Sequence, residues 1–493
     1  MIGSIIVALF VWSVFWWFKH YSHPKNFPPS PRVPWPLLGD ILLLGENIVS
    51  GFHAMKCKYG DIFGLFLGPQ RIVVICDFET LQEVMNRPEF TDRPLLFESQ
   101  RPFRLDDGQI PGIAFSNGMN WVEQRRFTLH SLRDHGFGKT PMEEIIDGQV
   151  ERLCQDLEKD NQMYQDVSTK FNIAIISALW KITTGQELAF DDEKAKSING
   201  CLSNIDLVNG SPIGTLAFTM PILGIILDKL KFFDFEGAFS NIARLTKPIV
   251  KEHRDTFQPD HIRDFIDSYI EAQNDPSKGF SFSGNTGDMN LFGILEDFYA
   301  AGSSTISLTL TWCMLFLSNY PEMQEKIQQE VERVTTGNRL IEFSERSQTP
   351  FTEAFIHETQ RCADIAPLAL FRICMKDTHI KSYFIPKGTI LISNLNAVMR
   401  NSKEFPDPWK FNPNRFIDDD GKFKPSLHVV PFGIGRRRCL GESLAKMELY
   451  KYITGVTQRF TIHRKTKSLN QESRMPKALT KPMTFYVKFV PRL

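Results

Sequence analysis

The chain lacks an excess of charge of either sign. It has 57 lysine and arginine residues against 57 aspartate and glutamate residues, so its formal net charge is zero. Proteins that attract nucleic acid or a strongly acidic substrate through their overall field usually carry a clear basic surplus. Composition therefore gives no argument for a nucleic-acid partner, and we expect none.

Paired cysteines are also lacking. The eight cysteines are scattered along 493 residues without a C-x-x-C pair. This distribution favours reduced core thiols in a cytosolic compartment over a disulfide framework. Aromatic residues, by contrast, reach 12% of the chain and include 41 phenylalanines, which favours a large apolar interior able to hold a greasy ligand.

Charge is absent from the N-terminal stretch of residues 2–18. Its length is near the lower limit of about 17 residues for a membrane-spanning helix. A cleaved signal peptide would begin with a charged region and end in small residues, and this stretch does neither. Lys19, Lys25 and Arg32 follow it, and the positive-inside rule then places the remaining chain in the cytosol. We predict an uncleaved membrane anchor over residues 1–18.

Two further segments are predicted to serve the membrane. Residues 19–40 contain the proline-rich run PPSPRVPWP, which predicts a stiff hinge ahead of a catalytic body over residues 41–493. Residues 201–236 are apolar and broken by glycine and proline. In an anchored protein such a segment can dip into the lipid surface and form a gate for apolar substrates.

A long apolar helix is predicted over residues 291–317, with Asp288 and Asn290 as cap-like residues before it. Glu296 and Asp297 lie inside the run, and two acids would be costly in a membrane span, so a central buried helix fits better. Spacing by four residues places Asp297, Ala301 and Thr305 on one face. A hairpin is predicted where residues 63–67 and 71–76 flank Gly68, Pro69 and Gln70.

The most informative stretch is residues 431–449, PFGIGRRRCLGESLAKMEL. Cys439 ends a turn rich in glycine and arginine, directly before a segment that predicts an amphipathic helix. The positive end of that helix and the arginines at 436–438 favour the thiolate, which binds iron and soft metals. By itself the stretch leaves open a buried core cysteine beside a solvated basic turn.

The pattern F-x-x-G-x-R-x-C-x-G, formed by Phe432, Gly435, Arg437, Cys439 and Gly441, resembles the cysteine-ligand loop of the cytochrome P450 superfamily. The resemblance implies heme b, iron protoporphyrin IX, with the thiolate of Cys439 as axial ligand. The two glycines would let the backbone approach the flat macrocycle, Phe432 would pack on the ring, and Arg437 would pair with a propionate.

Other motifs of the same family follow in order along the chain. They are W-x-x-x-R at 121–125, A-G-x-x-T at 301–305, E-x-x-R at 358–361 and N-P-x-R-F at 412–416. The resemblance is strongest to the microsomal family 2 group of animals, and it implies the P450 fold, which is mostly α with a small β-rich lobe. The residues whose roles it implies are Arg93, Trp121, Arg125, Arg372 and Arg437 for the haem propionates; Phe115, Asp297, Ala301, Thr305, Ala366, Leu370 and Leu479 for the substrate pocket; and Glu358, Arg361 and Arg415 for a buried cluster behind the cysteine loop.

The chain departs from the family at one place in the long helix. The family pattern is A-G-x-(D/E)-T-(T/S), and Ser304 stands at the position of the acid. An acid beside Thr305 normally helps to relay protons for oxygen activation. We expect activity to persist through the Thr305 hydroxyl, with Gly302 leaving room beside the iron, but with poorer use of electrons.

Three functions remain open at this point. The first is a monooxygenase of the endoplasmic reticulum membrane that acts on a lipophilic small molecule and receives electrons from NADPH-cytochrome P450 reductase, with cytochrome b5 as a further partner. The second is a haem-thiolate isomerase or dehydratase of lipid peroxides, and the third is a non-catalytic haem sensor. Retained Thr305 favours the first. Arginines at 125, 126 and 436–438 suit an acidic electron donor.

Overall fold

The computed structural model describes residues 17, 21–31, 33–94, 104–134, 136, 140–160, 163–208, 220–230, 235–337, 339–465, 474–475 and 479–492. The helices are α2 (Ile48–Tyr59), α3 (Phe78–Asn86), α4 (Gly118–Asp134), α5 (Thr140–Lys159), α6 (Ser168–Thr184), α7 (Glu193–Val208), α9 (Pro221–Lys229), α10 (Phe235–Thr256), α11 (Phe265–Asn274), α12 (Gly284–Asn319), α13 (Pro321–Thr335), α14 (Pro350–Ala363), α15 (Leu395–Met399) and α16 (Glu442–Arg459). The strands are β1 (Ile62–Leu67), β2 (Gln70–Ile75), β3 (Arg372–Ile373), β4 (Thr378–Ile380), β5 (Tyr383–Ile385), β6 (Ile390–Ser393), β7 (Phe460–Arg464), β8 (Arg474–Met475), β9 (Lys481–Pro482) and β10 (Val487–Pro491).

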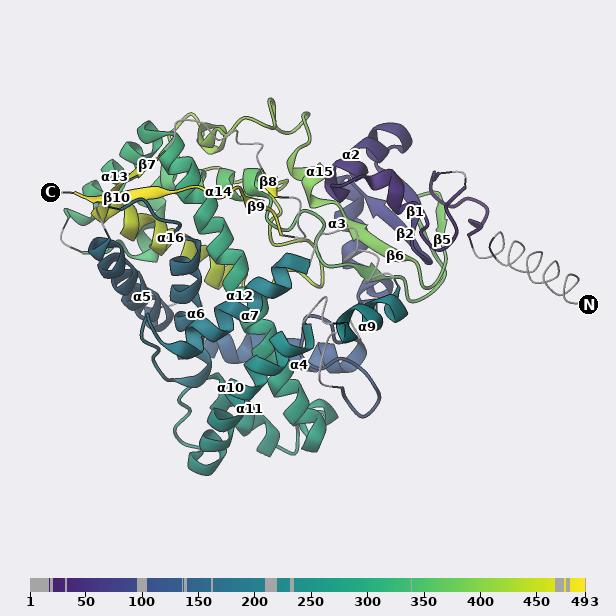
Figure 1. Ribbon diagram of the computed structural model, residues 1–493, viewed down its shortest axis with the longest axis horizontal. Coiled ribbons are helices and arrows are strands. Elements are labelled where there is room, and N and C mark those ends of the chain that lie inside the picture. Colours follow the sequence, from purple (N-terminus) through teal and green to yellow (C-terminus); the bar gives the residue numbers. More distant parts are fainter. Residues whose placement is uncertain are drawn as a thin grey trace, which may run out of the picture.

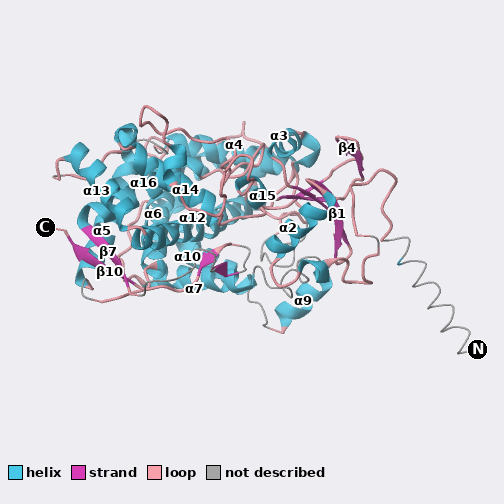
Figure 2. Cartoon of the chain, turned by 90° about the horizontal axis from the view of Figure 1, so that it is seen from above, coloured by secondary structure: helices cyan, strands magenta, loops and turns pink. Residues whose placement is uncertain are grey.

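The molecule has a large helical body and a smaller β-rich lobe at the N-terminal end (Figures 1 and 2). The lobe contains a four-stranded sheet in the order β1-β2-β6-β3. β1 and β2 form the predicted hairpin, with Leu67 opposite Gln70 at its turn. β6 then joins β2 in parallel and β3 pairs with β6 in the antiparallel sense, so this sheet places Arg372 near the helical body. The predicted fold class is confirmed.

Helix α12 crosses the helical body and contacts α6, α10, α14 and α16. Of the helices described, it alone is long and apolar enough to cross a membrane, and 78% of its most apolar window is buried in the protein. Its start differs from the prediction, because Asp288 and Asn290 lie inside the helix. Asn290 exchanges hydrogen bonds with Asn120 of α4 at 2.7 and 3.1 Å, and Asp288 pairs with Arg254. These side chains therefore join helices and cap nothing.

The segment predicted as a hinge is part of the lobe over most of its length. Phe27 and Asp40 are buried, and the Phe66 amide of β1 donates to Asp40 Oδ2 at 2.8 Å. Pro29 accepts a backbone hydrogen bond from Gly64 at 2.9 Å. The folded body thus begins before residue 41. The predicted anchor, Trp17 apart, lies outside the described residues.

Glu358, Arg361 and Arg415 come together behind the cysteine loop. Arg361 of α14 donates to both carboxylate oxygens of Glu358, at 2.7 and 2.9 Å, and both side chains are fully buried. Arg415 Nε and the Asn412 amide add bonds to Glu358 Oε1 at 3.2 and 2.8 Å. Because one buried carboxylate satisfies donors from two segments, its loss leaves Arg361 and Arg415 without a counter-charge, although both still donate to backbone carbonyls.

We expect Glu358→Gln to lower the free energy of unfolding by about 3–5 kcal/mol, since the fully buried guanidinium of Arg361 and the partly buried one of Arg415 lose their counter-charge. Urea unfolding of the purified protein measures the loss. The matched control is Glu193→Gln, which breaks the Glu193–Lys196 pair. That pair has the same i,i+3 spacing but side chains 88% and 47% exposed. Exposed pairs contribute under about 1 kcal/mol. Equal losses in the two variants would contradict this account.

Candidate active site: a cationic cavity at Cys439

Cys439 opens into a cavity of about 360 Å³ inside the helical body. One wall is a face of α12 and the opposite one is the cysteine loop with the first turns of α16. Arg125 of α4, Arg93 and Arg372 of β3 complete the lining. The cavity therefore brings together elements from most of the chain. Its walls are chiefly apolar, apart from the arginines and two acids, Asp297 and Glu448.

Five arginines line this cavity. Arg438 pairs with Glu442, and the other four are Arg93, Arg125, Arg372 and Arg437. Within the described residues, no carboxylate lies in ion-pair distance of any of these four. Arg437 donates to the carbonyls of Thr91, Ile113 and Ser116 at 3.0, 2.9 and 2.6 Å and stacks on the Trp121 ring at 3.9 Å. Arg93 donates to the carbonyls of Leu370 and Phe371 at 2.6 and 2.8 Å. Backbone carbonyls hold these side chains in place without neutralising them.

Crowding of like charges in a buried place disfavours the protonated guanidinium. Burial, followed by repulsion from Arg93, Arg437 and Arg125, lowers the pKa of Arg372 to about 7. Burial and the neighbouring arginines also lower the pKa of Arg437 to about 8, and burial with repulsion from Arg125 lowers that of Arg93 to about 9. Such a cluster is stabilised by an anionic group between the cations.

Two donors in the same place have no acceptor. Arg372 Nη1 and the indole Nε1 of Trp121 are both buried, and neither has a hydrogen-bond partner in the described part of the chain. Buried N–H groups are normally satisfied, so these two point to an acceptor that is not a protein atom. With the four guanidiniums, they form a site for a ligand that carries carboxylates.

The cysteine loop is held by its backbone. The Cys439 amide donates to the Phe432 carbonyl at 2.9 Å, and Phe432 lines the cavity. Gly435 has φ of +78°, and a Cβ there would stand 2.1 Å from the Met85 carbonyl oxygen, so glycine is required. No protein atom lies within 4 Å of the Cβ position of Gly441, which also lines the cavity. The loop thus leaves ligand space beside Cys439.

The expectation that the protein alone favours the Cys439 thiolate is wrong. Burial raises the pKa of Cys439, and the Gly441 amide, Arg125 and Arg438 only partly offset it. Arg437 points away to backbone carbonyls, and Arg438 pairs with Glu442 at 2.5 Å. Of the three arginines at 436–438, only Arg438 is among the groups that lower the pKa of Cys439. A bound metal cation would supply the missing stabilisation, since coordination deprotonates a thiol.

Helix α12 presents Asp297, Ala301, Gly302 and Thr305 to the cavity. Thr305 Oγ1 donates to the Ala301 carbonyl at 2.7 Å, which leaves its oxygen as an acceptor. A Cβ at Gly302 would stand 3.1 Å from Leu179 Cδ1, so the missing side chain lets α12 approach α6. Ser304 is buried and does not line the cavity.

The predicted substrate-pocket residues divide into two groups. Asp297, Ala366 and Leu370 line the cavity, whereas Phe115 and Leu479 are not among its lining residues. Asp297 Oδ2 accepts from the amides of Ile113 and Ala114 at 2.7 and 2.8 Å. This carboxylate therefore fixes the loop before α4, which favours the structural role over the binding of a basic amine.

Among the cavity residues that sequence reasoning missed, Glu448 of α16 is the one acid. It is buried, and burial raises its pKa to about 8. An acid on an otherwise apolar helix face was the available signal, because acids are rarely buried without a partner.

Comparison with known proteins decides the family. The profile described as Cytochrome P450 matches residues 28–489 of this chain. Cytochrome P450 2J5 of Mus musculus is 32% identical over 96% of this chain and 92% of its own length. Cytochrome P450 2A4 of Mus musculus is 32% identical over 99% and 97%, and cytochrome P450 2C1 of Oryctolagus cuniculus 33% identical over 94% and 92%.

The chain belongs to the cytochrome P450 family. This P450 is therefore an oxidoreductase, a haem monooxygenase, whose cofactor is haem bound through a cysteine thiolate. The cavity fits that group. Haem carries two propionates, and the cluster offers four guanidiniums with the two orphaned donors of Arg372 and Trp121. Cys439 is the one cysteine that lines the cavity in the described part of the chain.

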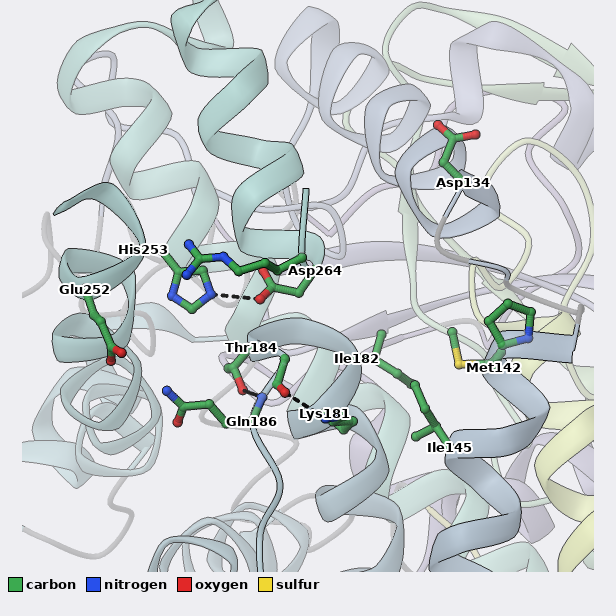
Figure 3. Close-up of a pocket in the computed structure, with 13 residues that line it drawn as sticks. Asp134, Met142, Ile145, Lys181, Ile182, Thr184, Gln186, Glu252, His253 and Asp264 are labelled. Atoms are coloured by element: carbon green, nitrogen blue, oxygen red, sulfur yellow. Dashed lines mark hydrogen bonds and ion pairs between the residues drawn. The ribbon is translucent and has the colours of Figure 1, made fainter. Parts of the chain in front are cut away.

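A second hollow in this P450, of about 590 Å³, is lined by none of the predicted site residues (Figure 3). His253 of α10 contacts Asp264 Oδ2 through Nε2 and the Ile249 carbonyl through Nδ1, both at 2.8 Å. Burial alone would lower the pKa of His253, but the Asp264 carboxylate and the carbonyl together raise it. Because both ring nitrogens face acceptors, the imidazolium joins α10 to the start of α11.

Proposed function

We propose that this P450 inserts one oxygen atom from O2 into a lipophilic small molecule, with Cys439 as the axial ligand and electrons from NADPH through a reductase. Haem bound through a thiolate activates molecular oxygen for insertion into an organic molecule. The observation that carries the proposal is the cavity in which Cys439, the arginine cluster and the Thr305 face meet.

The chain's own residues supply binding and proton handling. Arg93, Arg125, Arg372 and the Trp121 indole would hold the propionates, while Arg437 supports Trp121 by stacking on it. Leu370, Ala366 and Ala301 form apolar wall that would select substrates by shape. The Thr305 oxygen, with its proton held by Ala301, can accept a hydrogen bond from a cavity water.

An exposed basic surface supports an acidic electron donor as partner. Arg126, His130 and Arg133 of α4 and Arg436 of the cysteine loop line a shallow hollow of about 270 Å³, which no acidic residue lines. Such a surface would attract an acidic reductase, or cytochrome b5, near the haem edge and speed their encounter. The expected outcome of higher salt is slower electron delivery.

Exposed apolar side chains support a position on the endoplasmic reticulum membrane. Trp35 and Leu37 of the N-terminal segment are 59% and 60% exposed, and Ile226 and Leu230 are 48% and 71% exposed at α9. Figures 1 and 2 show α9 on the side of the β-rich lobe. Apolar surface of this kind binds lipid. Within the predicted gate at 201–236, residues 209–219 and 231–234 lie outside the described residues.

Electron supply separates this proposal from the isomerase and the sensor. We expect oxidised product from a lipophilic substrate panel only when NADPH, reductase and O2 are all present, because the cavity retains the Thr305 hydroxyl that an oxygen-activating site uses. Product analysis after incubation with NADPH or with a lipid peroxide alone is the measurement. Rearranged peroxide without NADPH would support the isomerase, and no turnover in either arm the sensor.

Ser304 stands where the family has an acid, so an acid introduced at this position should improve the use of NADPH. We expect Ser304→Glu to raise the ratio of product to NADPH consumed a few-fold, since a carboxyl beside Thr305 can deliver protons that the serine cannot. Ser304→Gln, which adds the same bulk without an acid, should leave the ratio unchanged. If both variants match the parent protein, the proton-relay argument fails.

A further inference from the structure

Glu448 lies on the face of α16 that borders the haem cavity. The lining residues of this helix are Leu444, Ala445, Glu448 and Leu449, which recur at helical spacing. Glu448 is the only one of them that carries a charge. It stands nine positions after Cys439 and is not among the groups that shift the pKa of Cys439. Glu448 therefore borders the haem site but does not act directly on the thiol of Cys439.

No hydrogen bond to Oε1 of Glu448 in the described part of the chain offsets the cost of burying this carboxyl. Glu448 is 1% exposed, and its Oε1 has no hydrogen-bond partner among the described residues. The hydroxyl of Tyr452, one turn further along α16, is likewise buried without a partner. Native proteins rarely leave two such groups together, because each has lost its water without gaining a bond. A functional reason is therefore required.

The groups beside Glu448 on α16 and α5 keep their charge near neutral pH, whereas Arg372 and Arg437 of the same cavity have pKa values of about 7 and 8 and titrate in this range. Burial raises the pKa of Tyr452 well above its usual value and raises that of Cys154, the adjoining thiol of α5, to about 12. Lys451, the next charged residue on α16, turns instead to Glu143 and Asp147, at 2.9 and 2.8 Å. Desolvation alone raises the pKa of Glu448 to about 8. Its protonation thus responds to charge in the cavity.

We propose that Glu448 is a charge-compensating residue, which takes up a proton when the haem of this P450 accepts an electron. One electron from a one-electron donor lowers the charge of the haem by one. The Glu448 carboxylate then binds one proton from solvent, so no second negative charge is left in the apolar site. Two like charges in a medium of low dielectric repel strongly, and neutralising the carboxyl removes that repulsion.

The direction in which the reduction potential changes with pH follows from the linkage between proton binding and reduction. Adding negative charge to the cavity raises the pKa of Glu448, so the reduced protein holds more protons than the oxidised protein at mildly alkaline pH. The reduction potential therefore falls as the pH rises above about 8, where the oxidised protein begins to lose this proton. Well below that pH Glu448 is protonated in both forms, and it contributes no slope to the potential.

The test is a spectroelectrochemical titration of the purified holoprotein between pH 6 and roughly pH 10, followed by the haem absorbance. We expect the reduction potential of the parent protein to fall as the pH rises above the pKa of Glu448, about 8. Glu448→Gln should remove this fall. Arg372 and Arg437 also line the cavity, so only the difference between parent and variant reports on Glu448. Glu442→Gln, at the start of the same helix, removes a carboxylate that pairs with Arg438 and Lys446, and it should shift the potential while the slope stays.

A second measurement uses the parent protein alone. Electrochemical reduction through a viologen mediator, which transfers an electron without a proton, in weakly buffered solution at mildly alkaline pH should be accompanied by uptake of as much as one proton per haem, seen with an indicator dye, and by little uptake at pH 6. Equal slopes in the parent and in Glu448→Gln would overturn the proposal. So would reduction of the parent protein without proton uptake, even if Glu448→Gln fails to retain haem.

Discussion

Four guanidiniums around one apolar cavity, three of them buried and that of Arg125 half-buried, are the constraint on which the rest of the structure depends. Arg93, Arg125, Arg372 and Arg437 are drawn from four separate parts of the chain. Carbonyls hold Arg93, Arg125 and Arg437, and no carboxylate of the described residues pairs with any of the four. Burial, together with repulsion from the other three, lowers the pKa of Arg372 to about 7. The two propionates of the family's cofactor would offset that repulsion, so binding of the cofactor would also stabilise the folded protein.

The fold supplies this centre by crossing two helices over it. α12 provides a face with Thr305 and few polar atoms, and α16 begins beside the cysteine loop and lines the cavity from the other side. The Glu358 cluster ties α14 to the segment of Arg415. Rigidity is thus concentrated behind the ligand loop. The exposed apolar side chains lie elsewhere, at α9 and the N-terminal segment.

The sequence predicted the fold class and the residues that meet at the cavity, because motif spacing carries that information. It could not predict which atoms those residues use. Arg437 donates to Thr91, a residue 346 positions away, so its distance from the sulfur depends on tertiary packing. For the same reason the pKa of Cys439 is raised despite three adjacent arginines. Glu448 was missed because its one signal, an acid on an otherwise apolar helix face, does not show by itself that the side chain is fully buried.

The central claim is that Cys439 binds the iron of a haem held by the arginine cluster. The most direct measurement is the difference spectrum of the reduced protein with and without carbon monoxide, for the parent chain and for Cys439→His. Thiolate ligation predicts a Soret band at clearly longer wavelength in the parent than in the variant, because the thiolate donates electron density to the iron. The same band in both proteins, or a parent protein that binds no haem, would contradict the account.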